Sequence, residues 1–312
     1  MSGERATAFV PGHVTGFFSA HPAGRPAAAG SRGAGFTLTD GVEVAVMAGI
    51  KQEAGGKGTG NDGNDGNDGN GGHDETATAT DRPAHTLDGD PTTIGAVNDV
   101  LDRLDVPGTA RVAVESDLPV GAGFGVSGAA ALGTALAAND AFDCGRSEND
   151  LIRIAHEAEV SRGTGLGDVV AQARGGIPVR VQPGAPGYGE LDGIPARTRI
   201  EYVSFGELST EEVLAGDTTA LSDAGEWALT RLQRDPRLPT LMGVSREFAD
   251  RAGLLVPEVS EAITAVEDAG GAASMAMLGR TVFATGTGLS DAGYDATACH
   301  THAAGAGLVR EE

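Results

Sequence analysis

Residues 116–128, SDLPVGAGFGVSG, decide the fold of this 312-residue chain. The run Arg111–Glu115 before them predicts a β-strand, and the alanine-rich segment after them, to about Ala138, predicts an α-helix. Glycines at positions 121, 123 and 125 let the backbone approach an anion closely, and the free N–H groups at a helix N-terminus favour negative charge. The pattern therefore predicts a phosphate-binding loop between a strand and a helix that begins near Ser127.

Two common phosphate-binding loops do not fit this stretch. A Walker A loop requires a lysine followed by serine or threonine, and residues 116–128 contain no lysine. Gly123–Gly128 has the Gly-x-Gly-x-x-Gly spacing of dinucleotide-binding folds, but that class needs a second strand that ends in an acidic residue about 20 residues later. Here the helix leads through a short turn to Ser147 and Asp150, a capping-box pattern that opens another helix. Both classes are excluded.

A third class of loop does fit. The segment from Pro119 to Ala130 resembles the motif Pro-x-Gly-x-Gly-Leu-x-Ser-Ser-Ala of the GHMP kinases, which include galactokinase, homoserine kinase and mevalonate kinase. The resemblance implies that the loop wraps the phosphates of ATP and that Ser127, which is followed by Gly128 rather than a second serine, helps to hold Mg²⁺. The alternative is an ordinary glycine- and alanine-rich turn. The residues expected to contact ATP are Pro119, Gly121, Gly123, Phe124, Gly125, Val126, Ser127, Gly128 and Ala129.

A glutamate on the next helix is the second predicted metal ligand. At 100° per residue, Glu159 falls within the apolar face formed between Leu151 and Ala158. Burying a lone charge is costly, so an inward carboxylate needs a partner. Mg²⁺ is commonly held by one or two carboxylates together with substrate phosphates. The alternative is an internal ion pair, for instance with Arg162.

Asp168 is the predicted catalytic base. It follows the turn Gly163–Gly167 and stands at the start of a short predicted helix, where an acidic residue can also be a simple cap. In the GHMP kinases, the catalytic aspartate follows a glycine-rich turn shortly after the metal-binding glutamate. The resemblance therefore implies that Asp168 accepts the proton of the substrate hydroxyl.

Four further strings are similar to the archaeal branch of this family that phosphorylates pantoate. They are PGHVTGFF at 11–18, GSRGAG at 30–35, GTGLGD at 163–168 and SMAMLG at 274–279. His13 stands where many GHMP kinases have arginine, and the 274–279 segment lacks most of the glycines of the general motif. The resemblance implies transfer of phosphate from ATP to pantoate, giving 4-phosphopantoate, a step toward coenzyme A.

Pantoate carries a carboxylate, which an arginine fork suits. Arg32 is the first candidate because glycines nearby allow close approach, Arg162 is the second and His21 the third. Each can instead be a surface cation. Ser31 and His13 complete the predicted acceptor site.

The pattern of elements predicts an α+β fold with two domains. Strands and helices mix without regular βαβ alternation. The expected division is an ATP-binding domain at 1–182, interrupted by a disordered Gly/Asn/Asp-rich insertion at about 54–81, and a second domain at 196–312. The resemblance implies a ribosomal protein S5 domain 2-like first domain, a ferredoxin-like second domain and a homodimer. We also expect a short strand over Ala6–Val10 that is broken by Pro11 and Gly12 and followed by a loop to Gly35. A linker is expected over Pro183–Pro195, and helices over Thr210–Ala215 and Tyr294–Ala304.

Composition excludes several classes of partner. The net charge of −22 disfavours nucleic acid and anionic membrane surfaces. Only Lys51 and Lys57 are lysines, and an acidic, lysine-poor surface is typical of a salt-loaded cytoplasm, where screening reduces self-repulsion. The alternative is a merely acidic protein. Cys144 and Cys299 are expected to be free thiols, and without a leader pattern or a long apolar run the protein is expected to be cytoplasmic.

Two rival functions remain open at this point. One is a GHMP kinase for homoserine, shikimate or mevalonate, since all of these acceptors also carry a carboxylate. The other is a GHMP-fold protein that binds a ligand without turnover. Ser127, Glu159 and Asp168 weigh against the second rival, because a pure binder needs no catalytic acid.

Overall fold

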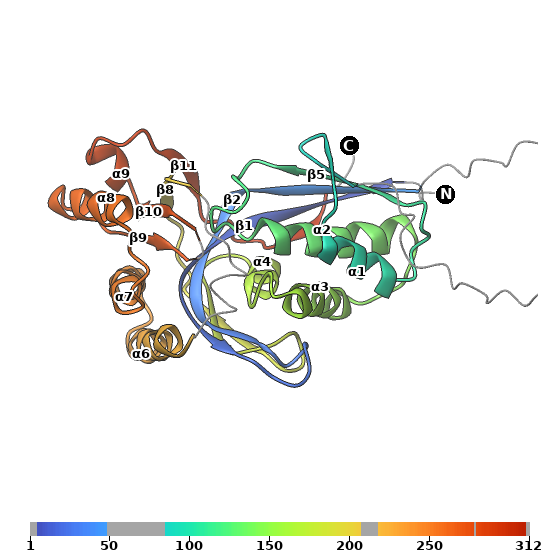
Figure 1. The fold of residues 1–312 in the computed structure, drawn as a ribbon, viewed down its shortest axis with the longest axis horizontal. Coiled ribbons are helices and arrows are strands. Elements are labelled where there is room, and N and C mark those ends of the chain that lie inside the picture. The colour runs from blue at the N-terminus through green and yellow to red at the C-terminus, as the bar shows by residue number, and fades with distance from the viewer. Residues whose placement is uncertain (1–4, 49–84, 207–217, 278, 310–312) are drawn as a thin grey trace, which may run out of the picture.

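The computed structural model describes residues 5–48, 85–206, 218–277 and 279–309 (Figure 1). The predicted insertion at 54–81 and the predicted helix at 210–215 lie outside the described residues. The described chain forms two sheets with helices packed against them, which confirms the α+β fold.

The larger sheet has eight strands and carries the N-terminal half of the chain. Its main path runs β12-β1-β2-β5-β3-β4, and β6 pairs with β2 and with β7. All of its strand pairs are antiparallel except β3 with β5. The strands are β1 (Arg5–His21), β2 (Gly30–Met47), β3 (His85–Leu87), β4 (Asp90–Thr92), β5 (Arg111–Ser116), β6 (Pro178–Gln182), β7 (Glu190–Gly193) and β12 (Gly307–Leu308).

The first two strands correct the loop expected between residues 10 and 35. β1 continues through Pro11 and Gly12 and pairs with β2 from Arg5–Met47 to His21–Gly30. Two register shifts, between Pro11 and His13 and between Thr15 and Phe17, absorb the residues that cannot follow a regular ladder. The pair bends sharply and extends as an arm beside β6 and β7, below the rest of the sheet in Figure 1.

Two helices, α2 (Val126–Ala141) and α4 (Asp168–Arg174), pack on one face of this sheet. Two further helices, α1 (Gly95–Arg103) and α3 (Glu148–Arg162), pack on α2. α2 is buried on nearly all sides, which is why it is built from alanine and glycine. Its Gly133 lies directly against Val44, where an added Cβ would come within 2.5 Å of Cγ2. Ser147 caps α3 by accepting a hydrogen bond from the N–H of Asp150, as predicted.

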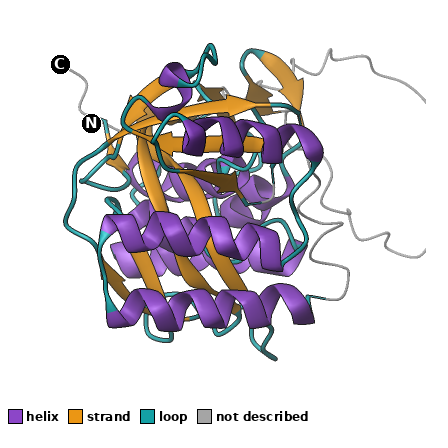
Figure 2. Ribbon diagram, turned by 90° about the vertical axis from the view of Figure 1, so that its left-hand side faces the viewer, coloured by secondary structure: helices purple, strands orange, loops and turns teal. Residues whose placement is uncertain are grey.

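The second sheet, in the order β11-β8-β10-β9, is fully antiparallel. Its strands are β8 (Arg199–Ser204), β9 (Ala273–Ala276), β10 (Thr281–Thr285) and β11 (Thr297–His300). The helices of this region are α6 (Thr219–Arg234), α7 (Leu238–Arg251), α8 (Pro257–Asp268) and α9 (Gly288–Asp291). Figure 2 shows their packing on the strands.

Two predictions in the C-terminal half are corrected. The helix expected over Tyr294–Ala304 is replaced by β11, because residues 297–300 pair with β8. The linker expected over Pro183–Pro195 contains β7, which extends the first sheet beyond β6. The chain end returns through β12 to pair with β1, so the last strand belongs to the first sheet. Within the described part of the chain, no helix is both long and apolar enough to cross a membrane.

Candidate active site

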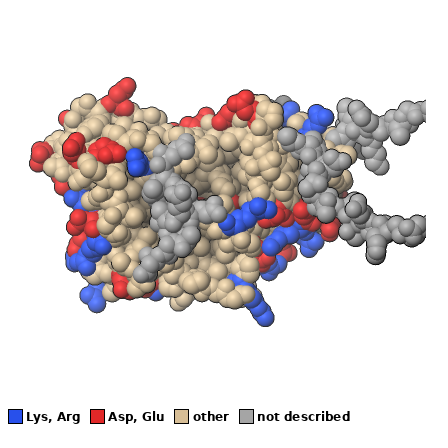
Figure 3. Space-filling model, in the orientation of Figure 1, with Lys and Arg blue, Asp and Glu red and all other residues tan. Residues whose placement is uncertain are grey.

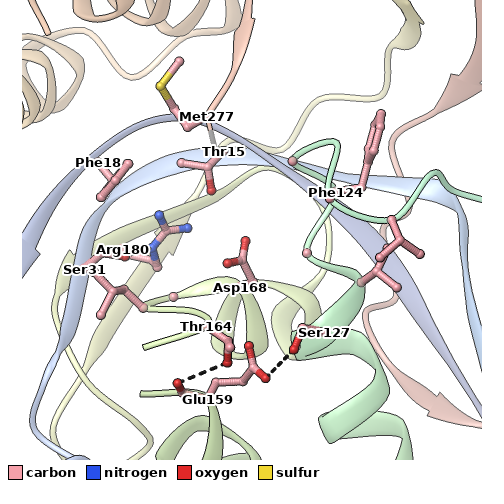
Figure 4. Close-up of a pocket in the computed structure, with 18 residues that line it drawn as sticks. Thr15, Phe18, Ser31, Phe124, Ser127, Glu159, Thr164, Asp168, Arg180 and Met277 are labelled. Carbon is pink, nitrogen blue, oxygen red and sulfur yellow. Dashed lines mark hydrogen bonds between the residues drawn. The ribbon is translucent and has the colours of Figure 1, made fainter. Parts of the chain in front are cut away.

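A cavity of about 290 Å³ lies where the two sheets meet the start of α2. Figure 3 shows a hollow in the middle of the molecular face that is turned to the viewer, and Figure 4 shows the side chains around the cavity. The phosphate loop forms one wall, the turn between α3 and α4 the floor, and the β1–β2 arm with β6 the opposite wall. The lining residues are Thr15, Phe18, Ser31, Val120, Gly121, Gly123, Phe124, Gly125, Val126, Ser127, Gly128, Glu159, Thr164, Leu166, Gly167, Asp168, Arg180 and Met277.

The predicted phosphate loop has the backbone that its glycines permit. Gly121, Gly123 and Gly125 have φ values of 75°, 90° and 67°, a region that side chains with a Cβ rarely adopt. Gly125 precedes the first turn of α2, whose leading N–H groups have no partner inside the helix. These N–H groups and the helix dipole make this wall of the cavity an anion site.

The second half of the chain holds the loop in place. The hydroxyl of Thr281 donates to the carbonyl of Ala122 at 2.8 Å. Gly279 packs flat against the loop, so a Cβ there would lie 2.0 Å from the Ala122 oxygen and 2.7 Å from the Gly123 nitrogen. Gly279 is the last residue of the 274–279 string. Although this string lacks most glycines of the general motif, it retains a glycine at the position where the contact requires one.

Glu159 points into the cavity from α3, as its place on the apolar face predicted. It is 3% exposed, and its Oε1 accepts a hydrogen bond from the Ser127 hydroxyl at 2.7 Å. Burial raises the pKa of Glu159 to about 7. The internal pair with Arg162 is not observed, because Arg162 bonds to Asp99 on α1.

These residues fit a divalent cation brought in with a phosphate. Among the described residues, no group of three or more histidine, cysteine or acidic side chains could by itself enclose a metal. One buried carboxylate beside a serine hydroxyl, at the end of an anion-binding loop, is the donor set expected when Mg²⁺ takes its other ligands from substrate phosphates and water.

Asp168 stands at the centre of the cavity and is held from behind by His13. Nδ1 of His13 lies 2.7 Å from Oδ1 of Asp168, and the side chains are 0% and 24% exposed. Burial opposes ionisation of Asp168, but the hydrogen bond from His13 and the nearby Arg180 charge together hold its pKa below the ordinary value. Asp168 is therefore a carboxylate with one oxygen engaged and one face open to the cavity.

Arg180 on β6 is the functional residue that sequence analysis missed. It is 2% exposed, its Nε donates to Ser31 Oγ at 3.2 Å, and its terminal NH1 has no hydrogen-bond partner among the described residues. Gly167 leaves room for the pair, since a Cβ there would lie 2.4 Å from Ser31 Oγ and 2.6 Å from Arg180 Nε. The available signal was an arginine within the otherwise apolar run Ile177–Val181.

Of the five residues predicted to bind the acceptor, the structure places one in the cavity and four outside it. Ser31 lines the cavity. Arg32 and His21 do not; both bond to Glu226 on α6. Arg162 lies at the surface with Asp99, and His13 does not line the cavity itself but bonds to Asp168, which does.

Of the residues expected to contact ATP, all but two line the cavity. Pro119 is exposed beside it, and Ala129 is buried inside α2. The residues that line the cavity without having been predicted are Arg180, Thr15, Phe18, Val120, Thr164, Leu166, Gly167 and Met277.

An anion-binding loop, a buried carboxylate beside a serine and a second carboxylate within one cavity define a small-molecule phosphotransferase. The model of the GHMP kinases N terminal domain matches residues 92–176. A pantoate kinase from Thermococcus kodakarensis is 36% identical, covering 89% of this chain and 86% of its own. A pantoate kinase from Methanospirillum hungatei is 31% identical, covering 92% and 89%.

A solved structure described as a phosphotransferase related to the CoA biosynthesis pathway superposes with a TM-score of 0.77 at 30% identity. It covers 98% of this chain and 99% of its own. The chain belongs to the GHMP kinases, in the family of the pantoate kinases to which it is similar.

Proposed function

We propose that this protein transfers the γ-phosphoryl group of ATP to the primary hydroxyl of pantoate, giving 4-phosphopantoate and ADP. The observation that carries the substrate assignment is the buried guanidinium of Arg180, which lines the same cavity as Asp168. Its terminal NH1 has no hydrogen-bond partner in the part of the chain that the structure describes. A buried cation with free donors favours an anionic acceptor. The pantoate kinases at 36% and 31% identity support the same acceptor.

Each of the two opposite walls of the cavity binds one substrate. The phosphate loop and the start of α2 bind the ATP phosphates through backbone N–H groups. Arg180 and Ser31 on the opposite wall bind the pantoate carboxylate, the guanidinium supplying charge and a planar pair of donors. This arrangement points the acceptor hydroxyl toward the centre of the cavity, where Asp168 lies.

Asp168 receives the hydroxyl proton as the hydroxyl oxygen forms its bond to the γ-phosphorus and the bond to the β–γ bridging oxygen breaks. The hydrogen bond from His13 fixes one carboxylate oxygen and leaves the other for the acceptor. The cavity wall formed by Phe18, Leu166 and Met277 limits the access of water, which would otherwise compete as acceptor.

Ser127 and Glu159 would hold Mg²⁺ against the ATP phosphates. A bound Mg²⁺ neutralises phosphate charge during transfer. Glu159 has to ionise to serve as a ligand, and a cation beside it favours that form. An ATP-dependent reaction on a small acid also fits a cytoplasmic enzyme.

The test is ADP release by the purified protein in molar KCl with Mg·ATP and, separately, pantoate, homoserine, shikimate or mevalonate. We expect turnover with pantoate at a kcat/KM well above the other three, and ³¹P NMR should identify a phosphate monoester on its primary hydroxyl. Turnover with another acceptor would keep the kinase assignment and overturn the substrate. ATP binding without turnover on any of the four would favour a non-catalytic ligand-binding protein.

A further inference from the structure

The β1–β2 arm has two faces, and only one of them lines the cavity. In an antiparallel ladder, paired residues point to the same face and their neighbours to the other. Phe18 pairs with Gly33, and Gly33 pairs with Arg180, which places Phe18 and Arg180 on the cavity side together with Ser31. Ser19 pairs with Arg32, so these two side chains lie on the opposite side, against α6.

Glu226 of α6 is the centre of the contacts on that opposite side. Its Oε1 accepts hydrogen bonds from Ser19 Oγ at 2.6 Å and from His21 Nε2 at 3.1 Å. Its Oε2 accepts one from the Arg32 guanidinium at 2.5 Å. One carboxylate thus joins both strands of the arm to the second half of the chain.

Arg32 also bonds to β6, the third strand of this cavity wall. While its NH1 bonds to Glu226, its Nε donates to the carbonyl of Val181 at 2.8 Å. Val181 follows Arg180 on β6, so the chain of contacts runs from α6 through Arg32 to the peptide beside the guanidinium that faces the cavity.

Helix α6 packs directly on the backbone of the arm. A Cβ at Gly225 would lie 2.1 Å from the Phe18 carbonyl oxygen, so only glycine permits this approach. The hydroxyl of Ser222 accepts a hydrogen bond from the N–H of Ala20 at 3.1 Å. Three residues of one helix therefore fix the part of β1 that carries Phe18.

We propose that Glu226 is a positioning residue for the acceptor half of the site: through Arg32 and Ser19 it holds the strands that carry Arg180, Ser31 and Phe18 in the geometry that recognises the acceptor carboxylate. This inference rests on the proposed function for the identity of the acceptor. It assigns Arg32, the first candidate from the sequence, to the support of the site instead of to direct contact with the substrate.

The test compares Glu226→Gln with wild type in steady-state kinetics. The amide keeps one acceptor oxygen for Ser19 and loses the charge that pairs with Arg32. We expect KM for pantoate to rise roughly tenfold, as for other residues that couple to a site without touching its ligand, with KM for ATP and kcat within about twofold. Asp223→Asn, which neutralises an exposed acid on the same helix, is the matched control and should leave all three constants unchanged.

A double-mutant cycle of Glu226→Gln with Arg32→Met tests whether Glu226 acts on the acceptor site through Arg32. If Glu226 acts through Arg32, the substitution Glu226→Gln adds little to KM for pantoate in the Arg32→Met background. Fully additive effects would overturn the inference, and so would a Glu226→Gln variant with wild-type KM for pantoate. An equal rise of KM for ATP and pantoate with a lowered Tm would show general loosening and would also overturn it. Because every readout is a ratio to wild type, a wild-type protein inactive on pantoate would refute the proposed function separately.

Discussion

His13 Nδ1 lies 2.7 Å from Asp168 Oδ1, a contact between two residues 155 positions apart in the sequence. The other ring nitrogen of His13 is buried against Gly35, where a Cβ would come within 2.7 Å, and has no hydrogen-bond partner among the described residues. Burial lowers the pKa of His13, so the ring is neutral near pH 7. We assign the proton to Nδ1, since that nitrogen faces the carboxylate, and His13 therefore orients Asp168 as a neutral donor.

This relationship predicts graded losses of kcat. Asp168→Asn should lower kcat by roughly 10²–10⁴-fold, the usual loss for a general base. His13→Leu should cause a smaller loss, and His13→Asn, whose amide N–H can replace the Nδ1–H donor, should recover part of it. The measurement is kcat in saturating ATP and pantoate, with ATP affinity by calorimetry as the control. Nearly full kcat in Asp168→Asn would refute the base assignment.

Arg180 should dominate the affinity for the acceptor. Removing a charge-assisted bond to a carboxylate typically costs about 1.5–3 kcal/mol, so Arg180→Met should raise KM for pantoate by roughly 10–100-fold. Arg180→Lys should recover only part of the loss, because an ammonium lacks the planar fork. KM for ATP is the internal control, since the phosphate loop lies on the opposite wall. A larger effect of Arg180→Met on ATP than on pantoate would reverse the assignment of the two walls.

Gly279 should be required for ATP binding. An alanine there would place its Cβ 2.0 Å from the Ala122 oxygen, and backbone atoms can relieve that contact only if the phosphate loop moves. We expect Gly279→Ala to weaken ATP binding roughly tenfold or more, since a displaced loop loses N–H hydrogen bonds to the phosphates and each bond to a charged group is worth about 1.5–3 kcal/mol. Gly243→Ala on α7, whose Cβ would meet nothing within 4 Å, is the matched control and should bind ATP normally. Equal ATP affinities in the two variants would show that this contact is unimportant.

Glu159 should make the metal-free protein less stable as the pH rises. Its pKa is about 7 in the fold against 4.5 ordinarily, so between these values the folded state holds a proton that the unfolded state has released. The free energy of unfolding therefore falls as the pH rises from about 4.5 to about 7, by up to about 3 kcal/mol. Glu159→Gln cannot ionise and should be more stable than wild type at pH 8 and similar to it at pH 5.

Urea unfolding of both proteins in EDTA at the two pH values measures this difference. The EDTA matters because a bound cation would stabilise the ionised Glu159 and reverse the sign. A stability difference between variant and wild type that is the same at pH 5 and pH 8 would contradict the prediction.

The net charge of −22 should make stability depend on salt. The screening length falls from about 10 Å at 0.1 M to about 3 Å at 1 M, which removes most repulsion between surface carboxylates. We expect Tm to rise steeply between 0.1 and 2 M KCl, and NaCl to act alike if screening is the cause. Full stability in dilute buffer would identify a merely acidic protein.

Local patterns accounted for the elements that depend on nearby residues. The glycines at 121, 123 and 125 set the phosphate loop, and Ser147 caps α3 through the N–H of Asp150. The inward orientation of Glu159 followed from helical periodicity alone, since every neighbour that defines the apolar face lies on the same helix. Capping, periodicity and glycine conformations act over a few residues, so one sequence is enough to read them.

Elements that depend on pairing with a distant strand were mistaken. Pro11–Gly12 resembled the end of a strand, yet β1 continues because β2 accommodates the register shifts. Residues 294–304 resembled a helix, yet β8 offers an edge to which Thr297–His300 pairs. In both cases the free energy gained by pairing with the neighbouring strand outweighs the conformational preference of the local sequence.

The sequence by itself determined that this chain has an anion-binding loop at a helix start, a buried carboxylate on the following helix and an aspartate at the next helix start. Only the tertiary structure decided which arginine faces the cavity. Arg32 and Arg180 both stand on strands of the same wall, but the register pairs Arg180 with Gly33 and turns Arg32 to the opposite face. Successive side chains on a strand point to opposite faces, so a shift of the register by one residue would exchange the faces. The register here is that between β2 and β6, whose residues Ser31 and Arg180 lie 149 positions apart in the sequence.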